Sequence, residues 1–86
     1  MKAIWKQVLD RADKQVVKLP VGAQILDVQI QKGSWCLWYI CSVESPLSDR
    51  YIAIYGTGSE VETLSGAYIG TIQDGPLVFH VFEVDE

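Results

Sequence analysis

The sequence holds few of the residues that catalysis and metal binding usually require. Its 86 residues include one histidine, His80, and two cysteines. One histidine and two cysteines on opposite faces of a strand do not make the four-ligand set of a structural zinc site. No paired carboxylates, activated nucleophile or metal cluster stands out along the chain. The composition therefore predicts a protein that is not an enzyme and that carries no metal or cofactor.

Long apolar runs are also missing. No run approaches the ~20 apolar residues of a membrane-spanning helix. Lys2, Lys6 and Asp10 interrupt the first residues of the chain, where a secretory leader would be apolar. We therefore expect no membrane segment and no signal peptide, and we place the protein in the cytoplasm.

The two cysteines are not expected to form a disulfide. Cys36 and Cys41 lie in the single expected strand 35–43, five residues apart. Five residues of extended chain span about 16 Å and place the two side chains on opposite faces. A disulfide needs Cα atoms within about 7 Å. Both residues are therefore predicted to be free, small hydrophobic residues, which suits a reducing compartment.

Positive charge is scarce and unevenly distributed. The net charge is −4. Residues 1–43 carry six Lys or Arg against three Asp, whereas residues 44–86 carry one Arg against eight Asp or Glu. A chain without a Lys/Arg cluster is a poor binder of long nucleic acid. The first half can still hold one small anion, and halves of opposite charge can pair across a symmetric interface.

What the sequence does contain is a series of short β-rich segments divided by turn residues. Hydrophobic residues make up 49% of the chain, which is enough for one small packed domain over residues 1–86. Short connections favour an antiparallel meander of about seven strands, closed as a small barrel or folded as a sandwich. The expected strands are 3–9, 15–19, 24–31, 35–43, 50–56, 67–73 and 77–85.

The segment 35–43 is apolar on both faces, which places it at the centre of the fold or against a second layer. Trp35 and Trp38 are an odd number of residues apart, so their side chains point to opposite faces of the expected strand. One is therefore expected in the core and the other against a ligand or a subunit. The sequence leaves open which is which. A core this small exposes apolar area that association buries, so we expect a homo-oligomer.

The stretch IYGTGSE, residues 54–60, has two interpretations. Gly56 and Gly58 can relax the backbone at a strand end, with Thr57 as a turn hydroxyl. Alternatively, these three residues present N–H groups and a hydroxyl to a phosphate. The segment lacks the lysine of a Walker loop and the third glycine of a dinucleotide fingerprint. Arg50, on the same expected strand, is a candidate partner for the anion.

His80 and two aromatic residues complete the candidate site. A lone histidine among apolar neighbours is usually a hydrogen-bonded core or interface residue, but it can also contact a ribose or a base edge. Trp38 or Tyr55 offers a flat ring on which a base can stack, and such a ring is equally suited to anchoring a protein interface.

Four motifs carry a resemblance to a known family: LPVGAQILDVQIQ, CLWYI, IYGTG and YIGTIQDGPLVFHVFE. From about Ile4 to Glu83 the chain resembles a family of small β-proteins of bacteriophages and prophages. The resemblance implies a protein made in an infected bacterial host. Small phage proteins without enzymatic motifs are similar in kind to the sponges that sequester nucleotide signals of antiphage defence.

The leading hypothesis is therefore non-catalytic capture of a small nucleotide-like immune signal in a pocket near a subunit interface. Glu60 and Glu62 follow the glycine-rich segment and repel polyphosphates, which favours a lightly charged or cyclic nucleotide. The alternative is a structural or protein-binding module, such as a virion accessory or an inhibitor that docks on a host protein. The expected ligand-binding residues are Trp38, Arg50, Tyr55, Gly56, Thr57, Gly58 and His80.

Overall fold

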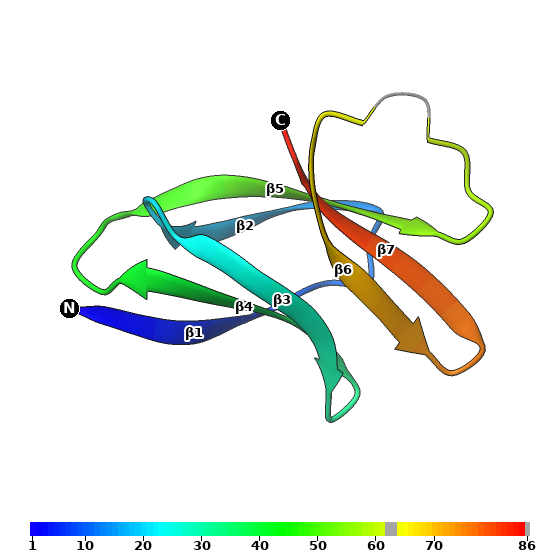
Figure 1. Cartoon of the computed structure of the whole chain (residues 1–86), viewed down its shortest axis with the longest axis horizontal. Helices are drawn as coiled ribbons and strands as arrows, with labels where there is room; N and C mark the ends of the chain where they lie inside the picture. The colour runs from blue at the N-terminus through cyan, green and yellow to red at the C-terminus, as the bar shows by residue number, and fades with distance from the viewer. Residues whose placement is uncertain (62–63, 86) are drawn as a thin grey trace.

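The computed structural model describes residues 1–61 and 64–85 and consists of seven strands with no helix in those ranges (Figure 1). The strands are β1 (Lys2–Val8), β2 (Lys14–Pro20), β3 (Gln24–Gln31), β4 (Ser34–Ser42), β5 (Leu47–Gly56), β6 (Gly66–Asp74) and β7 (Leu77–Val84). The predicted all-β class is confirmed. Across the described ranges, no helix long and apolar enough to cross a membrane is present.

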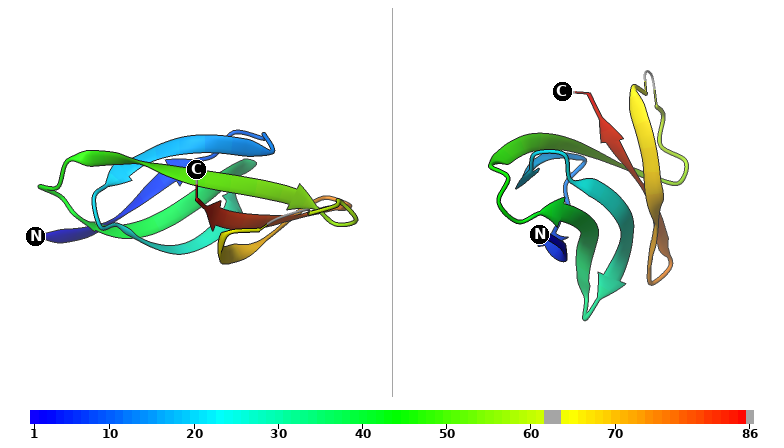
Figure 2. Two further views of the ribbon diagram at one scale, coloured as in Figure 1. Left: turned by 90° about the horizontal axis from the view of Figure 1, so that it is seen from above. Right: turned by 60° about the vertical axis from the view of Figure 1, so that its left-hand side comes forward.

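The strands form two antiparallel sheets (Figure 2). The first sheet has the order β1-β4-β3, and the second has the order β2-β5-β7-β6. The barrel alternative is wrong, because no ladder closes the two sheets on each other. The expected meander holds only for the hairpins β3–β4 and β6–β7. β4 holds the interior position of the first sheet, and β5 and β7 hold the interior positions of the second. β4 and β5 are largely buried, whereas the more exposed β1 and β2 lie at edges.

The core lies between the inner faces of the two sheets. It includes Trp35 and Leu37 from β4, Ile52 and Ile54 from β5, and Val81 from β7. This settles the open question about the tryptophans: Trp35 belongs to the core cluster and Trp38 points away from it.

The predicted state of the cysteines is confirmed. Cys36 and Cys41 are both free and buried. Cys41 belongs to the core cluster between the sheets, whereas Cys36 lies on the other face of β4. The odd spacing in one strand is therefore what keeps the two thiols apart.

The edges of the two sheets meet at β3 and β6, and we call this junction the seam (Figure 1). Each of the two strands has a register irregularity here, between Ile25 and Asp27 in β3 and between Tyr68 and Gly70 in β6. A Cβ atom on Gly70 would lie 3.0 Å from Cγ1 of Val28. The seam is therefore tight at Gly70, and glycine permits the close approach.

Candidate functional site: an aromatic face on the second sheet

The outer face of the second sheet carries a group of aromatic and hydroxyl side chains. Antiparallel register places Tyr55 opposite His80, His80 opposite Thr71, and Tyr68 opposite Phe82. These side chains have the opposite parity to Ile54 and Val81, so they point away from the core. We call this group, together with the residue that follows β5, the aromatic face. It comprises Tyr55, Thr57, Tyr68, Thr71, His80 and Phe82.

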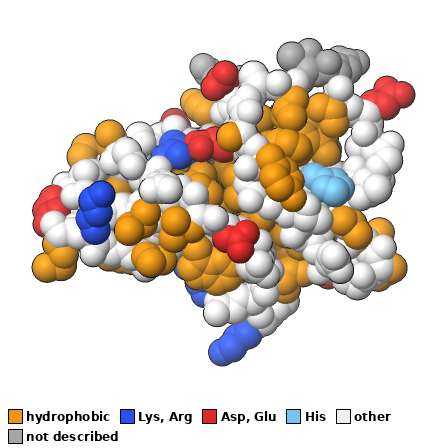
Figure 3. Space-filling view, in the orientation of Figure 1, with side chains coloured by type: hydrophobic (Ala, Val, Ile, Leu, Met, Phe, Trp, Pro, Cys, Tyr) orange, Lys and Arg blue, Asp and Glu red, His pale blue; other side chains and the backbone are white. Residues whose placement is uncertain are grey.

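Two tyrosine rings of the aromatic face pack edge to face against the ring of Phe82. The ring centroids of Tyr55 and Phe82 lie 5.9 Å apart, and those of Tyr68 and Phe82 lie 5.4 Å apart. Tyr68 remains 57% exposed. The packing therefore holds the rings in place while it leaves surface for another molecule. Figure 3 shows the histidine beside hydrophobic side chains on this side of the protein.

A chain of polar groups crosses the same face. The Thr57 hydroxyl lies 2.8 Å from Nε2 of His80, and the Thr71 hydroxyl lies 3.4 Å from Nδ1. The Tyr68 hydroxyl is hydrogen-bonded to the Thr71 hydroxyl. Because hydroxyls lie at both ring nitrogens, the imidazole is fixed in orientation. The face thus presents oriented donors and acceptors beside apolar rings.

The glycine-rich segment turns a corner at the end of β5. The N–H of Thr57 donates to the Val78 carbonyl at 3.0 Å, and the N–H of Ser59 donates to the Gly56 carbonyl at 3.0 Å. Gly58 has a φ of +94°, a conformation that favours glycine. Two backbone donors of this segment are thus used within the chain. The Thr57 hydroxyl is the group that the segment brings to the aromatic face.

Arg50 lies on the inner side of the second sheet, away from the aromatic face. Its Nε and Nη2 atoms donate to the carboxylate of Glu83, and its Nη1 atom donates to the Ala23 carbonyl at 2.9 Å. The Glu83 carboxylate raises the pKa of Arg50 above its ordinary value. The guanidinium therefore stays charged, and its charge is balanced inside the protein.

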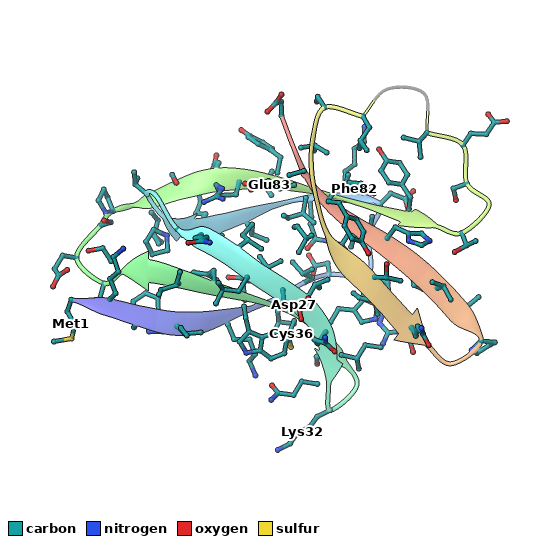
Figure 4. The ribbon with its side chains drawn as sticks, in the orientation of Figure 1. Met1, Asp27, Lys32, Cys36, Phe82 and Glu83 are labelled. Atoms are coloured by element: carbon teal, nitrogen blue, oxygen red, sulfur yellow. The ribbon has the colours of Figure 1, made fainter. Side chains whose placement is uncertain are left out.

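β7 contributes one side chain to each side of the sheet at Phe82 and Glu83. These consecutive residues point to opposite faces, Phe82 to the aromatic face and Glu83 to Arg50 (Figure 4).

Trp38 lies in the other sheet, opposite Lys6 and Asp27 in the two ladders of β4. The structure thus brings Tyr55, Thr57 and His80 together, with Gly56 and Gly58 adjacent. It separates Arg50 and Trp38 from them, and ligand contacts by those two residues stay predictions.

Three residues of the aromatic face were not predicted from the sequence, namely Tyr68, Thr71 and Phe82, and neither was Glu83, the partner of Arg50. Phe82 shares parity with His80, so alternation along β7 was a usable signal for it. Tyr68 and Thr71 are three residues apart, and simple alternation puts them on opposite faces. The irregularity between Tyr68 and Gly70 brings them to the same face.

The side chains of the aromatic face are suited to stacking and hydrogen bonding. The part of the chain that the structure describes contains no group of His, Cys, Asp or Glu side chains that could hold a metal ion. The aromatic face offers stacking surface, two threonine hydroxyls, a tyrosine hydroxyl and one imidazole. Such a set can hold a small ring-containing molecule by stacking and hydrogen bonds.

The fold defines the chain as a small β-protein of two antiparallel sheets. Residues 1–86 match a family described as a domain of unknown function, DUF7352, and the chain belongs to that family. No curated protein and no solved structure matches it. The family match says nothing about origin, so the phage context implied by the resemblance stays a prediction.

Proposed function

We propose that the protein captures a small nucleotide-like signal of bacterial antiphage defence on the aromatic face and does not convert it. The observation that carries this proposal is the aromatic face itself. One exposed ring, Tyr68, and two half-buried rings, Tyr55 and Phe82, share this face with a histidine whose two ring nitrogens both lie near threonine hydroxyls. Tyr55 or Tyr68 stacks on the base, which contributes about 1–3 kcal/mol per base. Thr57 and His80 hydrogen-bond the ribose or the base edge.

Charge favours a lightly charged or cyclic nucleotide as the ligand. The charge of Arg50 is balanced by Glu83 on the inner side of the sheet. Glu60 is exposed just after the glycine-rich segment and repels polyphosphate. Glu62, the other acidic residue in this argument, lies outside the described residues. A ligand with one or two phosphate charges is repelled less by this carboxylate than a triphosphate is.

A second copy of the chain covers the bound ligand in this proposal. The aromatic face continues into apolar residues of the same sheet face, including Val16, which is 54% exposed, and the half-buried Tyr51 and Val84. Association of two such faces removes apolar surface from water. The opposite net charges of the two halves of the chain favour a symmetric arrangement. We place the protein in the cytoplasm of an infected bacterial host.

A structural or protein-binding module is the second candidate. It is favoured by the apolar residues beside the aromatic face, because rigid aromatic rings on an apolar surface also anchor protein partners. In this case the partner replaces both the ligand and the second copy. Recovery of one stoichiometric protein partner, without a released small molecule, would place this candidate first.

The capture experiment uses lysate from bacteria whose nucleotide-signalling defence is active. The purified protein is incubated with the lysate, washed and denatured, and the released small molecules are analysed by mass spectrometry. We expect an intact nucleotide from the wild type. Tyr55→Ala and Thr57→Val each remove one proposed contact and reduce the yield by about tenfold, as a loss of ~1.4 kcal/mol requires.

The matched control is Ile4→Ala, an exposed apolar position on β1 in the first sheet. It should retain the captured nucleotide, because it changes apolar surface far from the aromatic face. Circular dichroism confirms that all variants keep the β-fold. Empty wild-type protein across several such lysates would contradict the proposed function.

A further inference from the structure

A recess lies at the seam, on the inner side of the second sheet and next to Arg50 and Glu83. This recess, the seam groove, has a volume of about 420 Å³. Its walls come from the turn and start of β3 (residues 22–26) and from β6 (residues 67–69), with Arg50 and Glu83 between them. Tyr68 lines the groove and also belongs to the aromatic face. Tyr68 is therefore the residue that the two sites share.

Two open strand edges border the seam groove. Among the described residues, β3 pairs with β4 alone and β6 pairs with β7 alone, so each is an edge strand of its own sheet, and the two strands are in contact. Both strands are irregular at this point, at Ile25/Asp27 and at Tyr68/Gly70. An edge strand presents backbone N–H and C=O groups that have no ladder partner. The groove walls thus offer neutral donors and acceptors in alternation.

The charged groups of the seam groove cancel each other. A guanidinium has five N–H donors. Three bonds from Arg50 go to Glu83 and Ala23, one from each of its three nitrogens. Each Nη atom therefore keeps one N–H beyond these bonds. Free N–H donors on a guanidinium whose charge is already balanced match the carbonyl or ring-nitrogen acceptors of a heterocycle better than they match a phosphate.

We propose that the seam groove binds the uncharged heterocyclic base of the nucleotide-like ligand, while the sugar and phosphate lie on the aromatic face beyond Tyr68. This inference rests on the proposed function. Of the two candidate stacking rings it selects Tyr68, which also lines the groove, and it leaves Tyr55, Thr57 and His80 to contact the sugar and phosphate. Arg50 then acts as a base-reading residue rather than as an anion partner. The strand edges of β3 and β6 add hydrogen bonds to the ring edge, and the Tyr68 ring lies between the two sites.

Nuclear magnetic resonance on ¹⁵N-labelled protein tests this inference with defined probes. The probes are the four ribonucleosides, ribose 5-phosphate and 3′,5′-cyclic AMP, each at millimolar concentration. We expect at least one nucleoside to shift the Arg50 Nε–H signal and the backbone amides of residues 22–26 and 67–69. Ribose 5-phosphate carries no base and should leave the Arg50 Nε–H signal and the amides of residues 22–26 in place, because these groups belong to the seam groove alone.

A blocking variant gives the second readout. Ala67→Trp places a large side chain at an exposed wall position of the groove, where it should fold normally. We expect its affinity for the responding nucleoside to fall by at least about tenfold. Ile4→Trp adds the same side chain to an exposed position of the first sheet and should bind like the wild type.

The outcomes separate this inference from the proposed function. If Ala67→Trp binds as the wild type does, while Tyr55→Ala weakens binding, the base does not enter the groove and the aromatic-face proposal stands. Shifts confined to the aromatic face overturn the inference in the same way. If no probe shifts any signal in the wild type, both the inference and the proposed nucleotide chemistry fail.

Discussion

We expect the Gly66→Ala variant to fail to fold. Gly66 begins β6 with a φ of +132°, a conformation that side-chain-bearing residues rarely adopt. A Cβ atom at this position would overlap the carbonyl oxygen of Glu83 and lie 2.8 Å from Cα of Val84. Both obstacles are backbone atoms of the neighbouring β7, so no side chain can move to make room. The expected cost is more than ~4 kcal/mol, a large part of the stability of a small domain.

Gly75→Ala is the matched control for the Gly66→Ala variant. Gly75 also has a positive φ, +61°, but an added Cβ would meet no atom within 4 Å. This variant isolates the backbone cost, which is about 1–2 kcal/mol. Circular dichroism and solubility after expression report the outcome. A Gly66→Ala protein that is soluble and melts near the wild-type temperature would contradict the described packing of β6 on β7.

Leu37→Ala is the second change with a large expected effect. Leu37 lies at the centre of β4, in the core between the sheets, and is 0% exposed. Truncating a buried leucine costs about 2–5 kcal/mol, because apolar contacts are lost and a cavity remains. Urea unfolding followed by tryptophan fluorescence measures the change in the free energy of unfolding.

The control for Leu37→Ala is Ile4→Ala, on the neighbouring strand β1. Ile4 is 60% exposed, so its truncation should change the free energy of unfolding by less than about 1 kcal/mol. Equal losses for the two variants would show that β4 does not form the centre of the core.

The strands were predictable because their patterns are local. Turn residues divide the chain, and β4 is apolar on both faces, so the sequence alone indicates an all-β fold with this segment at its centre.

The order of the strands within the sheets was not predictable from local patterns. β1 and β2 are consecutive in the chain but join different sheets. Their local patterns are compatible with either sheet, so the choice depends on packing against distant partners.

The candidate site was predictable only where strict alternation holds. Tyr55 and His80 point to one face of regular strands, and both were identified. Tyr68 and Thr71 share that face because the ladder is irregular between Tyr68 and Gly70, and no local residue pattern revealed this. The pairing of Arg50 with Glu83 spans 33 residues and depends on the register of β5 against β7. Sequence analysis therefore identified Arg50 as important but gave it no partner.

Native mass spectrometry of the protein after exposure to defence-active lysate tests the central claim most directly. The account predicts a species with the mass of two or more 9.6 kDa chains plus the mass of an intact nucleotide, which is released on denaturation. It also predicts that the released nucleotide is chemically unchanged, because the protein binds it without turnover. A 9.6 kDa monomer without added mass, or a cleaved nucleotide left in solution, would contradict the account.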